Sequence, residues 1–300
     1  MLPSIKGRSS PVPNSEVSGL MLSGQTLRQR ISPLANSTVQ LAVQSIAEEI
    51  REQHQKVRRK QRVTQENILD GFALLEASGV ALPDKALIST LSDKDFTGVA
   101  EDDLAFFTEM TYLDVSENYL QLSNFINLPK LKELKLACNN IRDIKREDLQ
   151  MPEIFISLRL LDLSFNRLSC SSVLSIGCLP CLKELNLCGN QLISLPDLTG
   201  FYSILEKVIL ERNKLDSCEV FSSLASLPKL REIGLAYNFL KNVPSAMCGA
   251  GTFQNLEVLD LAYNLFADES SVEAVLEMPR IKSVLLYGNP FLGSNTYLPS

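Results

Sequence analysis

Cysteine and histidine are the side chains in this sequence that could act as nucleophiles, acid–base groups or metal ligands. The chain has seven cysteines and one histidine. Cys178 and Cys181 have the C-x-x-C spacing of a metal-binding or redox pair. No second pair completes a zinc site, and the single histidine, His54, is distant in the sequence. Because the cysteines are odd in number and scattered, we interpret them as reduced thiols in the cytosol or nucleus.

Other signatures of catalysis are missing from the sequence. It has neither the phosphate-binding pattern G-x-x-x-x-G-K-[ST] nor the dinucleotide-binding pattern G-x-G-x-x-G. No serine or cysteine can be combined with His54 into a nucleophile–base pair by their positions. We therefore expect no catalytic residues, no cofactor, no metal site and no small-molecule substrate.

Asparagine is the residue that recurs at regular spacing. Eight segments match Leu-x-x-Leu-x-Leu-x-x-Asn-x-Leu, and their asparagines are Asn118, Asn139, Asn166, Asn190, Asn213, Asn238, Asn264 and Asn289. The spacings of 21 to 27 residues match the period of leucine-rich repeats. Because an asparagine amide both donates and accepts hydrogen bonds, we expect this ladder to turn inward and satisfy buried backbone groups. We interpret these asparagines as structural.

The leucines around each asparagine predict the fold. In the repeat of Asn238, Ile233 and Leu235 alternate with small or polar neighbours, as in a short strand with one buried face. One such unit cannot bury its apolar residues alone, whereas stacked units share a continuous core. The sequence thus predicts an α/β fold, a leucine-rich repeat solenoid. Its parallel sheet forms the concave face, and short helices, 3₁₀ turns and irregular segments return along the convex face.

The array is expected over residues 85–300, with helices at 101–108, 219–226 and 271–277. A ninth, degenerate unit precedes the others, with Ser89 at a leucine position and Lys94 at the asparagine position. The sequence after Asn289 is too short for a helical cap. We therefore expect either further chain or a partner over that end.

Three segments precede the array. Residues 1–35 are rich in Ser, Pro and Gly and predict a disordered or extended tail. Residues 36–63 predict an amphipathic helix with a heptad-like stripe. Residues 64–84 predict a helix, at 65–78 and ending at Gly79, that caps the open edge of the core.

The amphipathic helix is a candidate partner-binding element. Its candidate residues are Val43, Ile46, Ile50, Val57, Arg58 and Arg59. The stripe could instead pack on the chain's own solenoid. The basic cluster at its end either complements the helix dipole or serves nuclear import or contact with an acidic surface.

The variable strand positions between the leucines point away from the core, so they can be read as a binding face. The candidate concave-face residues are Asp162, Phe165, Glu211, Glu232, Tyr237, Asp260, Tyr263 and Tyr287. Grouped exposed aromatics are typical of protein-binding hot spots. The alternative is that tyrosine is simply common on solvent-facing strands. The acidic neighbours indicate a partner segment with Arg or Lys.

Charge is unevenly distributed along the chain. Residues 1–66 have ten Lys/Arg and five Asp/Glu, a net charge of +5, whereas the rest has 19 and 30, a net of −11. An acidic array makes nucleic acid an improbable partner, because basic surface dominates that affinity. We expect no membrane contact either, since no run of 18 apolar residues and no apolar signal region occurs.

The order of several motifs resembles one family. These motifs are Asp70-Gly-Phe-Ala-Leu-Leu, Phe106-Phe-Thr-Glu-Met-Thr-Tyr-Leu-Asp-Val-Ser-Glu-Asn, Leu128-Pro-Lys-Leu-Lys-Glu-Leu, Leu161-Asp-Leu-Ser-Phe-Asn, Leu179-Pro-Cys-Leu-Lys-Glu-Leu and Phe221-Ser-Ser-Leu-Ala-Ser-Leu-Pro-Lys-Leu. Over about residues 68–245 the chain resembles the X-ray radiation resistance-associated protein family. The resemblance implies a cytoplasmic and nuclear, non-enzymatic protein.

Together these features favour a protein that binds other proteins through its concave face and its N-terminal helix and tail. We expect a non-enzymatic scaffold in a large intracellular assembly, with the ciliary axoneme as the preferred assembly and a cytoplasmic location. The alternative is a regulatory binding module of a phosphatase or of a nuclear or stress-response complex, with the nucleus as the location.

Overall fold

The computed structural model describes residues 67–149, 154–245 and 251–292. The chain divides into two compact units, residues 1–36 and 37–300, and every described residue lies in the second. The predicted tail and the predicted amphipathic helix, including Val43, Ile46, Ile50, Val57, Arg58 and Arg59, lie outside the described residues and stay predictions.

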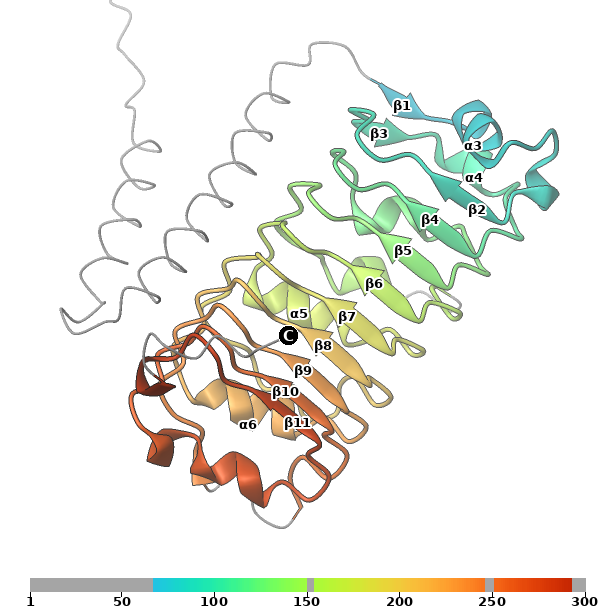
Figure 1. The fold of residues 1–300 in the computed structure, drawn as a ribbon. Helices are drawn as coiled ribbons and strands as arrows, with labels where there is room; N and C mark the ends of the chain where they lie inside the picture. The colour runs from blue at the N-terminus through green and yellow to red at the C-terminus, as the bar shows by residue number, and fades with distance from the viewer. Residues whose placement is uncertain (1–66, 150–153, 246–250, 293–300) are drawn as a thin grey trace, which may run out of the picture. The chain divides into compact units, whose positions relative to one another are not determined.

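Nine short parallel strands form one sheet in the described part of the chain (Figure 1). They are β2 (Ile88–Thr90), β4 (Tyr112–Asp114), β5 (Glu133–Lys135), β6 (Leu160–Asp162), β7 (Glu184–Asn186), β8 (Lys207–Ile209), β9 (Glu232–Gly234), β10 (Val258–Asp260) and β11 (Ser283–Leu285). Their order in the sheet follows the chain, so each repeat pairs with its neighbours in sequence. Corresponding residues lie opposite each other, as Leu113, Leu134 and Leu161 do. This topology confirms the predicted leucine-rich repeat solenoid.

The degenerate first unit has the predicted register. Ser89 of β2 lies opposite Leu113 of β4, so it occupies the position of a strand leucine. Its buried hydroxyl is satisfied by hydrogen bonds to the Ser78 hydroxyl and to the carbonyl of Leu74. Lys94 stands in the asparagine position, and its backbone N–H donates to Asn118 Oδ1 at 3.2 Å. An exposed lysine can replace the asparagine here because the next repeat's asparagine binds this loop.

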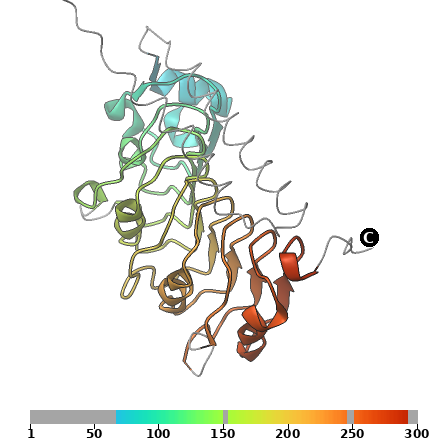
Figure 2. The same ribbon diagram turned by 90° about the vertical axis from the view of Figure 1, so that its left-hand side faces the viewer.

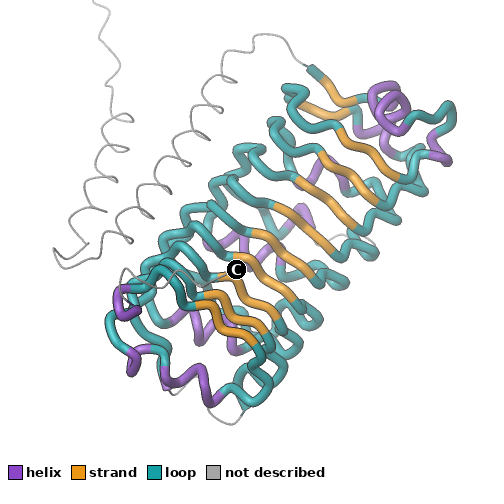
Figure 3. Tube along the Cα trace, in the orientation of Figure 1, coloured by secondary structure: helices purple, strands orange, loops and turns teal. Residues whose placement is uncertain are grey.

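Helical segments lie on the other side of the array from the strands (Figures 2 and 3). These segments connect consecutive strands and are α4 (Glu101–Leu104), η2 (Leu122–Phe125), η3 (Glu147–Leu149), α5 (Cys170–Ile176), α6 (Glu219–Ala225), η5 (Glu269–Ser271) and η6 (Glu273–Glu277), whereas η7 (Pro290–Leu292) follows the last strand, β11. These connections agree with the short helices and 3₁₀ turns expected for the convex side.

Individual helix predictions had mixed outcomes. The helix at 219–226 is confirmed as α6, which ends one residue earlier. The helix at 101–108 is shorter than predicted, because after Leu104 the chain forms tighter bonds such as Phe107 N–H to Leu104 O. The prediction of an α-helix at 271–277 was wrong. That segment is 3₁₀, with Val275 N–H bonded to Val272 O.

Helix α5 was not predicted. Its residues Cys170–Ile176 are mainly Ser and β-branched, which are weak helix formers. Ser169 caps it by accepting from the backbone N–H of Ser172 at 3.3 Å. Val173 and Ile176 are buried, so tertiary packing overrides the low propensity.

The N-terminal end differs from the predicted single helix. Ile68–Leu69 form β1, which pairs in parallel with β3 (Gly98–Val99). Helix α3 (Gly71–Ser78) therefore starts after residue 65, at a cap where Asp70 Oδ1 accepts from Ala73 N–H at 2.9 Å. It ends as predicted at Gly79, whose φ of +67° is left-handed. The short 3₁₀ turn η1 (Pro83–Lys85) follows.

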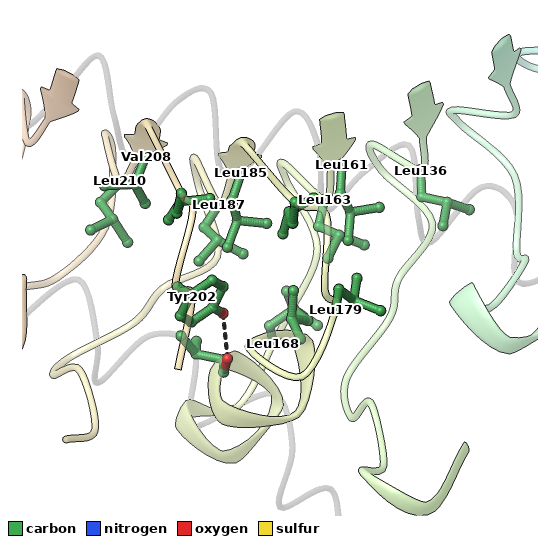
Figure 4. Packing of buried hydrophobic residues seen from close by; sticks show 14 of the residues in the cluster. Leu136, Leu161, Leu163, Leu168, Leu179, Leu185, Leu187, Tyr202, Val208 and Leu210 are labelled. Carbon is green, nitrogen blue, oxygen red and sulfur yellow. Dashed lines mark hydrogen bonds between the residues drawn. The ribbon is translucent and has the colours of Figure 1, made fainter. Parts of the chain in front are cut away.

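The template leucines form one continuous core. Figure 4 shows its layers, with Leu161, Leu185 and Val208 in one row and Leu163, Leu187 and Leu210 in the next. Full burial of such a side chain contributes about 1.5–3 kcal/mol. Among these apolar groups, the buried Tyr202 hydroxyl donates to the carbonyl of Val173, and burial raises the pKa of Tyr202.

Candidate protein-binding face

The asparagine ladder holds the loops that follow each strand. Asn213 is buried, and its Oδ1 accepts from the backbone N–H of Leu192 at 3.0 Å. Its Nδ2 donates to the carbonyls of Leu187 at 3.0 Å and Leu210 at 2.9 Å. Each of these asparagines bonds both its own repeat and the preceding one in this way. These hydrogen bonds are the ones expected of a structural ladder.

The residue before each asparagine has a left-handed backbone, which sequence reasoning missed. These residues are Glu117, Cys138, Phe165, Gly189, Arg212, Tyr237, Tyr263 and Gly288, with φ between +52° and +75°. Only two are glycine, although a side chain there costs roughly 1–2 kcal/mol. The asparagine bonds on both sides of the loop impose this conformation.

The side of the sheet opposite the core is called the open face, and it is the face predicted as concave. Three tyrosines meet there. The rings of Tyr237 and Tyr263 stack with centroids 4.3 Å apart and planes 11° apart. Tyr287 meets Tyr263 edge to face at 5.3 Å and 89°. Tyr237 and Tyr263 stack because they hold the same position in consecutive repeats, and neighbouring strands are about 4.8 Å apart.

Arg212 completes this group from the preceding repeat. Its guanidinium carbon lies 4.7 Å from the centroid of Tyr237, a cation–π contact. Burial raises the pKa of Tyr237 to about 12; Tyr263 adds to this shift, and the Arg212 charge opposes it. The tyrosine cluster is defined as Tyr237, Tyr263 and Tyr287.

The acidic residues of the open face fall into two kinds. Asp162 Oδ1 accepts from Ser164 N–H at 2.8 Å, and Asp260 Oδ1 accepts from Ala262 N–H at 2.9 Å. These carboxylates therefore also stabilise the turn after their own strands, a role not predicted. Glu232 is paired with Lys207, with Oε2 and Nζ 2.8 Å apart.

Glu211 lies beside the tyrosine cluster. A Cβ atom on Gly234 would stand 3.0 Å from Glu211 Oε1, so this carboxylate lies over the glycine backbone. Burial raises the pKa of Glu211, the charge of Asp260 adds to the effect and Lys207 opposes it. Burial also raises the pKa of Asp260, against the lowering effect of the Ala262 N–H.

The predicted face therefore divides into separate places. Five of the candidate residues come together in the repeats of β8–β11, namely Glu211, Tyr237, Asp260, Tyr263 and Tyr287. Arg212, Gly234 and Gly288 join them and were not among the candidates. Phe165 lies apart from this group. Its ring covers Gly189 of the next repeat, where an added Cβ atom would lie 2.6 Å from the ring. Three strand spacings, roughly 14 Å, separate its repeat from that of Tyr237.

The cysteines show no built site within the described residues. Cys178 and Cys181 are partly exposed free thiols. No group of three His, Cys, Asp or Glu side chains that could hold a metal is present in the described ranges. Burial raises the pKa of the Cys188 thiol to about 12.

Two further points concern membrane-spanning helices and a surface cavity. Among the described residues, no helix has the length and apolar character needed to cross a bilayer. A hollow of about 640 Å³ lies beside the last strand, β11, between η5 and η6 and the residues Val284, Leu286 and Phe291.

Comparison with known proteins agrees with this architecture. A family model described as Leucine Rich repeat matches residues 127–144. The chain is 34% identical over 198 residues to X-ray radiation resistance-associated protein 1 of Mus musculus, covering 59% of this chain and 24% of that protein. It thus spans about a quarter of that relative's length.

A second relative covers more of the chain. Leucine-rich repeat-containing protein 23 of Bos taurus is 26% identical over 262 residues, which cover 78% of this chain and 70% of that protein. Among solved structures, internalin C2 of Listeria monocytogenes matches with a TM-score of 0.55 at 18% identity, covering 72% of this chain and 91% of that one. This structural likeness concerns the fold alone.

Proposed function

Because this chain is a leucine-rich repeat protein that resembles X-ray radiation resistance-associated protein 1, we propose that it is a non-enzymatic scaffold that binds other proteins. We place it in a large intracellular assembly, with the ciliary axoneme as the preferred one. We prefer the axoneme because long repeat solenoids with tethering tails recur there. The array would hold one partner, and the N-terminal segment would tether the protein.

One observation carries the proposal for the array. The tyrosine cluster is grouped on the open face, next to the carboxylates of Glu211 and Asp260. Tyrosine combines apolar area with a polar hydroxyl and is enriched at protein-binding hot spots. The three tyrosines follow strands β9, β10 and β11 and are absent from the buried core, which leaves these rings available for a partner.

The double variant Tyr237→Ala/Tyr263→Ala tests this face. Proximity labelling of the intact protein in ciliated cells identifies candidate partners, and pull-down with each candidate measures binding. We expect the double variant to bind several-fold more weakly. Its free energy of unfolding should be lower by about 0.5–1.5 kcal/mol, because the ring pair is lost. The matched control is Phe72→Ala, since Phe72 is an exposed aromatic on α3. Equal labelling and binding by the double variant would remove the proposal.

A regulatory binding module, of a phosphatase or of a nuclear or stress-response complex, is the second candidate. It is favoured by the location of the tyrosine cluster and its carboxylates on the array alone. Deletion of residues 1–62 separates the two functions. Loss of the deleted protein from the assembly, with partner binding unchanged in vitro, supports the tethered scaffold. Normal incorporation without residues 1–62 contradicts the tether and leaves the regulatory module.

A further inference from the structure

Two acidic residues of the open face lie on either side of a glycine. Gly234 of β9 lies opposite Asp260 of β10 in the sheet register. Glu211, which follows β8, places its carboxylate over Gly234 from the other side. The Cβ atom of an alanine at position 234 would lie 3.0 Å from Glu211 Oε1. The missing side chain of Gly234 therefore leaves the space that the Glu211 carboxylate occupies, and the charge of Asp260 acts on that carboxylate.

Small residues and an aromatic ring accompany this pair. Ala236 and Ala262, two positions after Gly234 and Asp260, are buried. After burial, the charges of Asp260 and Glu211 both contribute to the raised pKa of the Tyr287 phenol, which places Tyr287 near the two acidic groups. The acidic patch is defined as Glu211, Gly234, Asp260 and Tyr287. It combines two acidic groups, a glycine and an aromatic ring that is 37% exposed.

The cations near the acidic patch contact other groups. The ammonium of Lys207 forms its ion pair with Glu232, at 2.8 Å. The guanidinium of Arg212 lies over the ring of Tyr237. Glu211, Glu232 and Asp260 outnumber these two cations, so the patch and its surroundings have a net negative charge.

We propose that the acidic patch binds an arginine side chain presented by a segment of a partner protein. The inference rests on the proposed function, since it names the chemistry that the same face recognises. A guanidinium is planar, donates several hydrogen bonds in a fixed fork and packs against aromatic rings. Lysine has a compact, strongly hydrated charge that fits two carboxylates beside a ring less well.

The electrostatics of the carboxylates agree with a cationic occupant. Burial raises the pKa of both Glu211 and Asp260, so their ionised forms lack full compensation in the protein alone. A bound guanidinium supplies the opposite charge that they lack. Binding should therefore strengthen as the pH rises through the pKa values of these groups.

A random linear peptide library displayed on phage, selected against the intact protein, tests the inference. We expect the selected peptides to share an arginine. In a synthetic copy of one selected peptide, replacing that arginine by citrulline, which is neutral and nearly the same shape, should weaken binding measured by fluorescence anisotropy about tenfold or more. Replacement by lysine should have a smaller effect.

Variants of the protein complete the test. Glu211→Gln and Asp260→Asn should each weaken the arginine peptide about tenfold, and Asp260→Asn keeps an oxygen for the Ala262 N–H. Glu133→Gln is the matched control, since Glu133 is an exposed glutamate of β5 on the same sheet.

The outcomes separate this inference from the proposed function. Peptides that lose binding to Tyr237→Ala/Tyr263→Ala but do not need arginine would overturn the arginine site and leave the binding face intact. Peptides that bind the double tyrosine variant as well as the wild type would contradict both. Equal binding of lysine or citrulline peptides, unchanged binding to Glu211→Gln and Asp260→Asn, or no selected peptide would each overturn the arginine site.

Discussion

The ring of Tyr263 lies directly over the backbone of Gly288 in the next repeat. A Cβ atom on Gly288 would come within 2.4 Å of Cδ1 of the ring, closer than any real contact. Gly288 also has a φ of +75°. Its lack of a side chain therefore serves both the turn and the position of the central ring of the tyrosine cluster.

The substitution Gly288→Ala should displace Tyr263 and destabilise the fold. Gly200→Ala is the matched control, because Gly200 has a φ of +84° but no atom within 4 Å of an added Cβ. Both variants carry the left-handed backbone strain of roughly 1–2 kcal/mol, and only Gly288→Ala adds a steric clash of about 1–3 kcal/mol. Urea denaturation measures the difference, and equal losses of unfolding free energy would show that the ring does not depend on this glycine.

The asparagine ladder predicts a loss of stability without a change of surface. Asn213→Ala should lower the free energy of unfolding by about 1–3 kcal/mol, because the buried backbone groups of Leu187, Leu192 and Leu210 lose their partner. The control is Asn127→Ala, since Asn127 is exposed. Chemical denaturation of both variants checks the prediction, and a neutral Asn213→Ala would argue against the role of the ladder.

The pH dependence of stability tests the burial of Glu211. Its pKa is raised from the ordinary value of 4.5, so the folded protein binds this proton more tightly than the unfolded chain. The resulting stabilisation is present at low pH and is lost as the pH rises through the raised pKa. Glu211→Gln should therefore gain stability relative to wild type as the pH rises from about 4 to 7, measured by urea denaturation at each pH.

Glu257 provides the opposite case as a control. It accepts from Arg231 Nη2 at 2.7 Å and Lys282 Nζ at 2.6 Å, and the Lys282 contact, followed by Arg231, lowers its pKa. Its stabilisation is present at neutral pH and is lost as the pH falls through the lowered pKa. Glu257→Gln should thus lose stability at neutral pH. If both variants changed in the same direction with pH, the burial of Glu211 would be contradicted.

The sequence pattern predicted the positions of the helices less well than those of the strands. The strand leucines could be placed from the sequence because each repeats the same short pattern and has its partner in the next repeat. The convex segments have no such repeated constraint. Helix α5 forms from weak helix formers because Val173 and Ile176 pack on the core, whereas residues 273–277 stay 3₁₀ despite a helical sequence.

The candidate binding face, too, could be predicted from the sequence only in part. The sequence identified Tyr237, Tyr263 and Tyr287 as outward residues and Glu211 and Asp260 as their acidic neighbours. It could not reveal that Gly234 leaves space for the Glu211 carboxylate, or that Asp260 also holds the turn at Ala262. Those relations join residues from different repeats, and they depend on side-chain directions that spacing does not specify.

By itself, the sequence determined a stack of repeats with a buried leucine core and an asparagine ladder, because every unit carries its own residues for contact with the next. Only the tertiary structure decided which outward side chains touch. The left-handed backbone before each asparagine aims Tyr237 and Tyr263 along the sheet, and the absent side chains of Gly234 and Gly288 leave the space that Glu211 and Tyr263 occupy.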